Sequence, residues 1–520
     1  MSVLLDVVTA ARHFADLPTC LVATCVCLLA YLYLQRPRNL PPGPRGWPIV
    51  GNLPILAKSA FTPATLTELS NQYGDVMTIW TGQVPAIILT GYETIRTALV
   101  KRAEDFSSRK ISPFVADIRG DGTTKDTAKG VLMAAYGPHW KHQRKFAMMT
   151  LRDFGVGKRS LEGKVNEEAN ALVQEVLSQN GQPFDLKITM QNAVSNIICS
   201  IVFGDRFEYG DPDFLRLIRL LNATFETKPT VRGLLVRIQP VFRHLLFTGA
   251  SSGETLVKMF QALQEFCDEQ MEKHRQTFDP NDIRDFIDAF LLEQQRAEDE
   301  QARKNFSDKQ LQEVLIDLFL AGTETTATTI RWALLYMMLN PEIQEKAVMC
   351  PQVHQEIDSV LGQSLTSYAQ RNLLPYTTAT LAEVQRIKPI LPLSVPHATS
   401  GDTTLNGYNI PQGTMILVNL WSVHMDPQLF PEPNQFQPER FLDQDGNFVK
   451  HEALIPFGIG QRICLGEQLA KMELFMLFVS LMQRFTFHLP EGAPKPSMVG
   501  RLGSAVNVPF PFELCAIPRG

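Results

Sequence analysis

One ten-residue segment near the carboxyl end constrains this chain more than any other: Phe457-Gly458-Ile459-Gly460-Gln461-Arg462-Ile463-Cys464-Leu465-Gly466. A helical pattern begins at Glu467, so Cys464 is expected at the mouth of a helix, where amide N–H groups and the helix dipole stabilise a thiolate and lower its pKa. The same amides can donate to the sulfur and adjust its electron donation to a metal. The glycines allow the backbone to approach a planar ligand, and Arg462 is placed to neutralise an anionic group on it. The alternative is a buried, inert cysteine.

The chain has eight cysteines, and their arrangement argues against a disulfide framework or a zinc site. The sequence contains no CxxC pair, and Cys20, Cys25 and Cys27 lie in one apolar run, so a reducing compartment is expected. No HExxH motif occurs either. The HxxH formed by His139 and His142 is more typical of two surface histidines beside a turn.

The amino-terminal segment has the pattern of a membrane anchor. Leu17 to Leu34 is a run without a charge, just long enough to span a bilayer as a helix. Arg36 and Arg38 follow, which favours a cytosolic location for the rest of the chain. A cleaved signal peptide is the alternative, but the preceding stretch is not basic and no small-x-small site ends the run. We expect an anchor at residues 1–35, a stiff proline-rich tether at 36–48 and one domain at 49–520.

Composition limits the remaining possibilities. The 520 residues are 45% hydrophobic and 20% charged, with a net charge of −5. Abundant apolar residues exclude disorder, and the lack of a basic excess gives no indication of nucleic-acid binding. Length alone suggests three or four domains, yet no repeat or low-complexity linker follows residue 48.

Helical periodicity dominates the body of the chain, and the predicted fold class is mainly α with small β-sheets. Two short strands are expected at Val76–Trp80 and Ala86–Thr90, either side of a turn that contains Gly82. The clearest helical patterns are Arg159–Leu177, Glu254–Thr277, Asp308–Leu339 and Gly466–Phe485.

Three motifs in order resemble the cytochromes P450. The ten-residue segment fills every fixed position of the family's haem-binding signature, Phe-x-x-Gly-x-Arg-x-Cys-x-Gly, including Phe457 and Gly466. Glu383-Val384-Gln385-Arg386 matches the family's Glu-x-x-Arg, and Phe436–Phe441 is similar to the segment whose arginine, here Arg440, joins that pair. The resemblance implies haem b bound through the Cys464 thiolate, between a long central helix and the Cys-loop helix. By itself, an ExxR pair is more often a surface ion pair.

The third motif is Ala321-Gly322-Thr323-Glu324-Thr325-Thr326. Glycine and several threonines are unfavourable in mid-helix, and threonine hydroxyls can bond back to carbonyls and open the helix. Taken alone, the segment indicates a helix weakened at a packing contact. The resemblance instead implies that Glu324 and Thr325 are the family's acid–alcohol pair, which organises water and delivers protons during dioxygen activation.

The resemblance also implies further haem and substrate contacts. Trp140 and Arg144 match the family's Trp-x-x-x-Arg, and together with Arg109 and His397 they are expected to hold the haem propionates. Asp317, one turn before Ala321, is a candidate contact for a basic substrate, although a helix contact is the commoner role. The substrate-lining positions implied by the family are Phe114, Ala321, Thr325, Leu391, Val395, Ala505 and Val506.

The family resemblance, which covers about residues 40–520, fits its microsomal second branch, with stretches similar to the D subfamily. It implies a monooxygenase that inserts one oxygen atom of O2 into lipophilic substrates such as fatty acids, steroids or xenobiotics. Electrons would come from NADPH through NADPH–cytochrome P450 reductase, with cytochrome b5 as a second candidate partner, at the endoplasmic reticulum membrane. The expected basic docking residues are Lys141, His142, Lys145, Arg462 and Lys471.

Two alternatives stay open: a P450-fold isomerase or hydroperoxide-rearranging enzyme, and a non-catalytic haem-thiolate sensor. One local departure from the family pattern also stands out. Without Ala347–Gln352, which include Cys350-Pro351, the surrounding residues would form one uninterrupted helical pattern. We expect a local bulge there that leaves haem binding intact.

Overall fold

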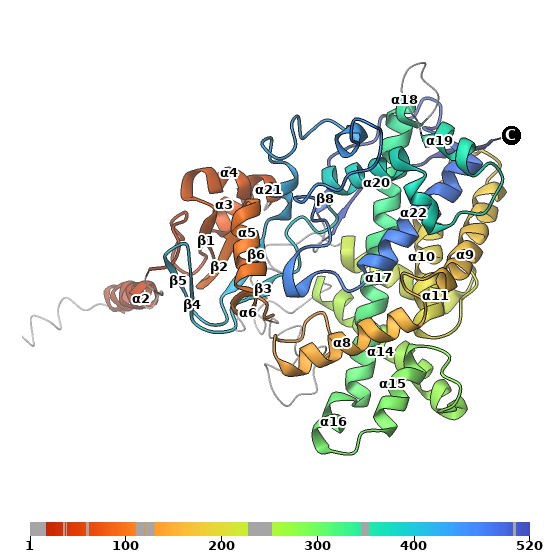
Figure 1. Ribbon diagram of the computed structural model, residues 1–520. Helices are drawn as coiled ribbons and strands as arrows, with labels where there is room; N and C mark the ends of the chain where they lie inside the picture. The colour runs from red at the N-terminus through yellow and green to blue at the C-terminus, as the bar shows by residue number, and fades with distance from the viewer. Residues whose placement is uncertain are drawn as a thin grey trace, which may run out of the picture.

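Two regions make up the fold in the computed structural model, and each is drawn from distant parts of the chain (Figure 1). The structure describes residues 17–34, 37, 39–58, 62–110, 119, 129–226, 252–344, 353–502 and 506–519. A smaller, strand-rich region combines early residues with residues near 397–424, and a larger helical region holds most of the remainder. The predicted class, mainly α with small β-sheets, is confirmed.

A four-stranded sheet lies at the centre of the strand-rich region, in the order β1-β2-β6-β3. Its strands are β1 (Val76–Thr81), β2 (Val84–Leu89), β6 (Met415–Val418) and β3 (His397–Ala398). β1 and β2 form the predicted antiparallel pair, whereas β2 pairs parallel with β6, with Ala86 opposite Met415. The sheet therefore ties the beginning of the chain to a strand from its last quarter.

Short elements surround this sheet, as Figure 1 shows for the helices. They are α3 (Leu53–Lys58), α4 (Pro63–Tyr73), α5 (Tyr92–Arg96), the π-helical segment η1 (Thr97–Lys101), α6 (Ala103–Phe106), α21 (Leu420–His424), and the paired strands β4 (Thr403–Leu405) and β5 (Tyr408–Ile410).

The long central helix α17 (Asp308–Leu339) organises the helical region and has the predicted bounds. Ser307 caps its start, because the hydroxyl accepts a hydrogen bond from the Gln310 amide at 3.3 Å. The other helices here are α8 (Pro138–Asp153), α9 (Arg159–Ser178), α10 (Lys187–Val202), α11 (Pro212–Glu226), α14 (Ser252–Thr277), α15 (Phe286–Gln295), α16 (Glu300–Asn305), α18 (Pro341–Gln344), α19 (Val353–Val360), α20 (Pro375–Ile387) and α22 (Glu467–Arg484).

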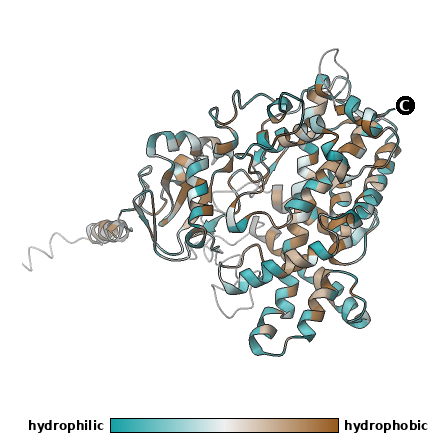
Figure 2. Cartoon of the chain, in the orientation of Figure 1, coloured by the Kyte–Doolittle hydropathy of each residue, from teal (hydrophilic) through white to brown (hydrophobic). Residues whose placement is uncertain are grey.

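The main hydrophobic core lies where α10, α20 and α22 pack against α17. Figure 2 shows hydrophobic residues concentrated along these contacts and hydrophilic residues on outward-facing turns. The second half of α17 is buried almost all round, which marks it as a core helix rather than an amphipathic surface helix. Such a helix can place polar side chains, among them Glu324, deep inside the protein.

The carboxyl half also contains short helices and paired strands. They are the 3-10 helices η2 (Tyr368–Asn372), η3 (Pro438–Phe441) and η4 (Gly460–Arg462), and the strands β7 (Phe485–His488), β8 (Arg501–Leu502), β9 (Asn507–Val508) and β10 (Cys515–Pro518). β7 pairs with β10, and β8 pairs with β9.

The amino-terminal apolar run forms the helix α2 (Leu17–Leu34). Across the described part of the chain, no helix has the combination of length and apolar character needed to cross a membrane. The proline-rich segment, which we expected to be a stiff tether, contacts β1. The carbonyls of Pro41 and Pro42 accept hydrogen bonds from the side chain and amide of Thr78 in β1, at 2.7 and 2.9 Å, so this segment packs on the sheet.

The expected bulge at Ala347–Gln352 lies outside the described residues, as do Phe114 and Ala505. α18 ends at Gln344 on one side of that segment, and α19 begins at Val353 on the other.

Candidate active site

The loop before α22 carries Cys464 and has the conformation that its glycines allow. Gly458 and Gly460 have φ of 74° and 80°, in the left-handed region. A Cβ on Gly460 would lie 2.0 Å from the Leu99 carbonyl oxygen of η1. Gly460 is therefore needed for packing against η1, a role that the sequence did not indicate. α22 begins at Glu467, after Gly466, as predicted.

We expected a lowered pKa for the Cys464 thiol, and for the protein alone this expectation was wrong. Burial raises the pKa of this thiol, and Glu467 raises it further. The predicted effects do act, because the Gly466 amide and Arg144 lower the pKa of Cys464, but the desolvation by surrounding protein atoms is larger. The side chain nevertheless remains exposed on one side, and its own amide donates to the Phe457 carbonyl at 3.0 Å.

Arg462 turns inward from the Cys464 loop. Its guanidinium donates to the carbonyls of Ser107, Val131 and Ala134, at 2.7, 3.2 and 2.6 Å. It also stacks on the Trp140 ring, 3.9 Å from the centroid. Because Arg462 points into the protein, it does not belong to the expected docking face.

Two further arginines gather near Arg462. Arg109 donates to the carbonyls of Val395 and Pro396 at 2.6 and 2.7 Å, and Arg144 donates to the Ile463 carbonyl. Burial lowers the pKa of Arg109 to about 9, and Arg144 adds to this effect. Burial and the charges of Arg109 and Arg144 lower the pKa of Arg462 to about 8.

These guanidiniums have the properties of an anion site. None of the three forms an ion pair with an aspartate or glutamate in the described ranges. Moreover, Arg109 Nε is buried without a hydrogen-bond partner. Buried cations without counter-charges are costly unless an anion pairs with them. The arrangement therefore suits a ligand with carboxylates, such as the two propionates of haem.

His397 and Trp140 flank the arginines. His397 is buried, with Nδ1 2.8 Å from the Phe106 carbonyl oxygen, and burial together with Arg109 keeps its pKa well below the usual value. A neutral His397 can then donate from one ring nitrogen only. Trp140 donates its indole N–H to the Val131 carbonyl at 3.0 Å. In this structure Trp140 thus contacts a backbone carbonyl and the Arg462 guanidinium. Its predicted contact with a haem propionate stays a prediction.

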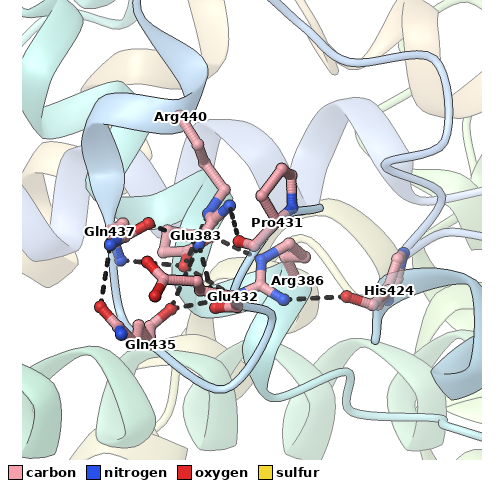
Figure 3. A network of polar contacts seen from close by, with 8 residues as sticks. All are labelled: Glu383, Arg386, His424, Pro431, Glu432, Gln435, Gln437 and Arg440. Atoms are coloured by element: carbon pink, nitrogen blue, oxygen red, sulfur yellow. Dashed lines mark hydrogen bonds and ion pairs between the residues drawn. The ribbon is translucent and has the colours of Figure 1, made fainter. Parts of the chain in front are cut away.

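The predicted ExxR pair, Glu383 and Arg386, is present and fully buried at the centre of a polar network (Figure 3). Arg386 donates Nε and Nη2 to the two Glu383 oxygens at 2.6 and 2.7 Å, a bidentate pair. Arg440 joins through Nε at 3.2 Å, as expected. Arg386 also donates to the carbonyls of His424 and Gln435, at 2.8 and 3.3 Å, so the network joins α20 to the segments behind the Cys464 loop.

Glu324 and Thr325 occupy different faces of α17. Thr325 lies on the less buried side, where its hydroxyl donates to the Ala321 carbonyl at 2.8 Å, which is the predicted back-bonding. Glu324 is buried toward α10 and bonded by Gln191 and Thr328. Burial raises the pKa of Glu324, partly opposed by the Thr328 hydrogen bond and by Lys187. A raised pKa suits a carboxyl group that must give up and regain protons near neutral pH.

Asp317 has a helix-contact role in this structure. One carboxylate oxygen accepts from Arg119 at 2.6 Å, and the other accepts from the amides of Val131 and Leu132 at 2.8 and 2.9 Å. Arg119 also pairs with Glu313 one turn earlier. With both oxygens engaged, Asp317 fixes the segment before α8 onto α17, which the alternative reading of the sequence anticipated.

The described substrate-lining candidates come from three parts of the chain. Ala321 lies beside Thr325 on the exposed face of α17, and Leu391 and Val395 are partly buried in the segment that ends at β3. Val506 is buried just before β9. All four side chains are apolar.

A cysteine just before a helix, a group of arginines without carboxylate partners in the described residues and a buried glutamate in the central helix fit a haem-thiolate protein. The chain belongs to the cytochrome P450 family, whose model matches residues 41–516. It is 40% identical to human cytochrome P450 2U1, over 95% of this chain and 92% of that protein. It is 41% identical to human cytochrome P450 2J2 and 42% identical to rat cytochrome P450 2D4, with 96% of this chain covered in each case and 96% and 98% of those proteins. The family carries haem with a cysteine thiolate as axial ligand, and this chain is a haem monooxygenase.

Sequence reasoning missed three residues of the site. Gln191, which donates to Glu324, and Asn222, which pairs with Gln191, are ordinary polar residues in helical stretches. Arg119 lies in a charged segment without a family motif. Nothing in their local sequence indicates that they are buried, because their partners lie on other helices.

Proposed function

We propose that this cytochrome P450 inserts one oxygen atom of O2 into lipophilic substrates, namely fatty acids, steroids or xenobiotics. The electrons come from NADPH through NADPH–cytochrome P450 reductase, with cytochrome b5 as a second candidate donor. The observation that carries the proposal is the group of guanidiniums from Arg109, Arg144 and Arg462 beside the Cys464 loop, without carboxylate partners in the described parts of the chain.

In this proposal, the Cys464 thiolate would bind the haem iron, and the guanidiniums of Arg109, Arg144 and Arg462 would hold the propionates, while the one N–H of neutral His397 is directed to the Phe106 carbonyl. Haem, when bound, supplies the activation of dioxygen. The ring face of Trp140 stacks on the Arg462 guanidinium and helps to hold it in place. Phe457 and Gly466 set the path of the loop, since Phe457 accepts the Cys464 amide and Gly466 precedes the first turn of α22.

Proton delivery falls to the central helix. The Thr325 hydroxyl lies on the exposed face beside Ala321, where it can orient water, and its own proton is engaged with the Ala321 carbonyl. Glu324, on the neighbouring face, is the group that takes up and gives up the proton, and Gln191 holds its carboxyl. Ala321, Leu391, Val395 and Val506, with Phe114 and Ala505 from the family pattern, supply apolar surface for the substrate. This surface favours lipophilic molecules because burying apolar groups is the main source of affinity in such pockets.

The partner surface is proposed to be basic and to lie near α8. Lys141 and Lys145 are exposed on that helix, and Lys471 lies on α22. We place the catalytic domain, residues 49–520, in the cytosol at the endoplasmic reticulum membrane, with residues 1–35 as the anchor. The uncharged composition of α2 and the arginines that follow it support this arrangement.

Two measurements test the proposal. The reduced, carbon-monoxide-bound protein should give the Soret band typical of thiolate-ligated haem, and its absence would refute Cys464 ligation. Product formation should then require NADPH and purified reductase. Turnover without them would favour an isomerase, and binding without turnover a sensor.

Thr325→Ala tests the proton step directly. It should keep the thiolate spectrum and NADPH consumption but lower product formed per NADPH, because water near the reacting atoms is no longer oriented. The control is Thr329→Ala one turn further on, where the hydroxyl donates to the Thr325 carbonyl at 2.8 Å. Equal coupling in wild type and Thr325→Ala would contradict the role.

A further inference from the structure

Both carboxyl oxygens of Glu324 are held by side chains that do not face the substrate side of α17. The Gln191 amide nitrogen on α10 donates to Oε2, and the Thr328 hydroxyl donates to Oε1 at 2.7 Å. Glu324, Gln191 and Thr328 are each 1% exposed. The carboxyl is therefore fixed in a closed environment, about 100° around the helix from Thr325.

Gln191 is oriented by a second amide. Asn222 of α11 donates Nδ2 to Gln191 Oε1 at 2.7 Å, and Gln191 Nε2 donates to Asn222 Oδ1, also at 2.7 Å. The two amides thus form a reciprocal pair, and Asn222 is buried as well. In this arrangement, Gln191 Nε2 uses both of its hydrogens, one on Asn222 and one on Glu324.

A reciprocal amide pair can satisfy either protonation state of a carboxyl group. With a charged Glu324, Gln191 presents N–H, as observed. If both amides turn over together, the Gln191–Asn222 bonds re-form with exchanged atoms, and the Gln191 oxygen faces Glu324. That oxygen can accept the O–H of a protonated Glu324, while Thr328 continues to donate to the other oxygen. A lysine in place of Gln191 could only donate, so it could not accept the O–H of a protonated Glu324.

We propose that Gln191 and Asn222 are positioning residues that keep the buried Glu324 carboxyl hydrogen-bonded both before and after it gives up its proton. The inference rests on the proposed acid role of Glu324. The step moves one proton and no electrons: the Oε2–H bond breaks, a water molecule that reaches the carboxyl accepts the proton, and a proton from solvent later restores the acid. Without the Gln191 amide, Oε2 would lose the side-chain partner observed there in either state, and an unpaired buried polar group is costly.

Charged groups on several elements also act on Glu324. Lys187 of α10 and Arg331 of α17 favour the charged form, whereas burial favours the neutral form. On the opposite side of α17, α22 contributes Glu473, a buried acid that is hydrogen-bonded to Thr326. Burial raises the pKa of Glu473 to about 8. Burial, Lys187 and Arg331 act on the balance between the two states of Glu324, and the amide pair can bond to either state.

The test compares ferric holoenzyme variants by infrared spectroscopy as a function of pH. The band of protonated Glu324 is identified by its loss in Glu324→Gln. In Gln191→Met, which keeps the side-chain length, the midpoint of this band should rise by about one to two pH units, because the charged form loses a hydrogen bond. Asn222→Leu should raise the midpoint less, since Gln191 remains but is no longer oriented. The matched control is Ser195→Ala: Ser195 is one turn along α10 and donates to Thr323, not to Glu324.

Coupling of NADPH use to product provides the second measurement. Introduced into the wild-type protein, Gln191→Met should lower the product formed per NADPH several-fold. Introduced into the Glu324→Gln variant, it should cause no further loss, since both changes act on one step. An unchanged midpoint in both Gln191→Met and Asn222→Leu, or the same shift in Ser195→Ala, would overturn the inference. If instead Glu324→Gln leaves coupling unchanged, the proposed acid role itself fails. The thiolate spectrum shows that each variant is folded.

Discussion

Loss of the Arg386 side chain should be among the most damaging single changes in this protein. In Arg386→Met, the buried Glu383 carboxylate loses a bidentate partner at 2.6 and 2.7 Å, and the carbonyls of His424 and Gln435 lose their donor. Removing one member of a buried ion pair costs about 3–5 kcal/mol, mostly because a charge is left unpaired in a desolvated site. That is a large share of the about 5–15 kcal/mol that stabilises a typical protein.

The remaining contacts decide where in that range the cost falls. Glu383 keeps Arg440 at 3.2 Å and the Gln437 amide at 3.0 Å. Since one charge and one donor remain, we expect a loss near the lower end, about 3 kcal/mol. Arg386→Lys should recover part of it, because the charge returns but the two-pronged geometry does not.

The assay measures urea unfolding of the holoenzyme by far-ultraviolet circular dichroism, together with haem retained per protein. Because a chain of this size need not unfold in one step, midpoints rather than extrapolated free energies are compared. The matched control is Arg296→Met, which removes an exposed arginine that pairs with Glu293 at the same i,i+3 spacing. Exposed pairs contribute little, so this variant should behave as wild type. If Arg386→Met and Arg296→Met shift the midpoint equally, burial is not what makes the Glu383 network important.

Two further predictions follow from single contacts. Gly460→Ala should abolish the thiolate-haem spectrum, because the added Cβ would clash with the Leu99 carbonyl. The control is Gly446→Ala, which has a similar φ of 81° but open space around it and should retain the spectrum. Equal spectra for the two variants would contradict the steric argument. Burial lowers the pKa of His274, but its hydrogen bond and ion pair with Asp285 at 2.8 Å outweigh this and raise it. The pair should therefore stabilise the protein fully below pH about 6.5 and progressively less as the pH rises through the raised folded-state pKa of His274. His274→Gln should then lower the thermal midpoint more at pH 6 than at pH 9. A difference between variant and wild type that does not change with pH would refute this prediction.

Local patterns were enough to predict two strands, four long helices and the directly bonded motifs. α17 has the predicted bounds, and Glu383, Arg386 and Arg440 meet as the motif order indicated. Spacing along one helix places Glu383 and Arg386 on one face, so their contact needs no knowledge of the rest of the fold. The backbone acceptors of Arg386 could not be predicted, because they come from loops whose paths depend on the whole structure.

The direction of a buried side chain was harder to predict than its identity. Glu324 and Thr325 are adjacent in sequence, but successive residues of a helix point about 100° apart, and only the packing of α10 shows which of them is enclosed. The expectation of a lowered pKa for Cys464 was wrong for a related reason. Helix-end effects are visible in a sequence, whereas desolvation depends on atoms from elsewhere in the fold.

The parallel pairing of β2 with β6 has a consequence for how the protein is made. Ala86 emerges from the ribosome long before its partner Met415, and at about 5–20 residues per second tens of seconds separate the two strands. During that time β2, with the apolar sequence Val-Pro-Ala-Ile-Ile-Leu, has only the hairpin with β1 to cover it. Isolated hairpins are marginal in water, so the nascent chain carries an open, apolar strand edge through most of its synthesis. Completion of the sheet is a late event that only the nearly full-length chain can achieve.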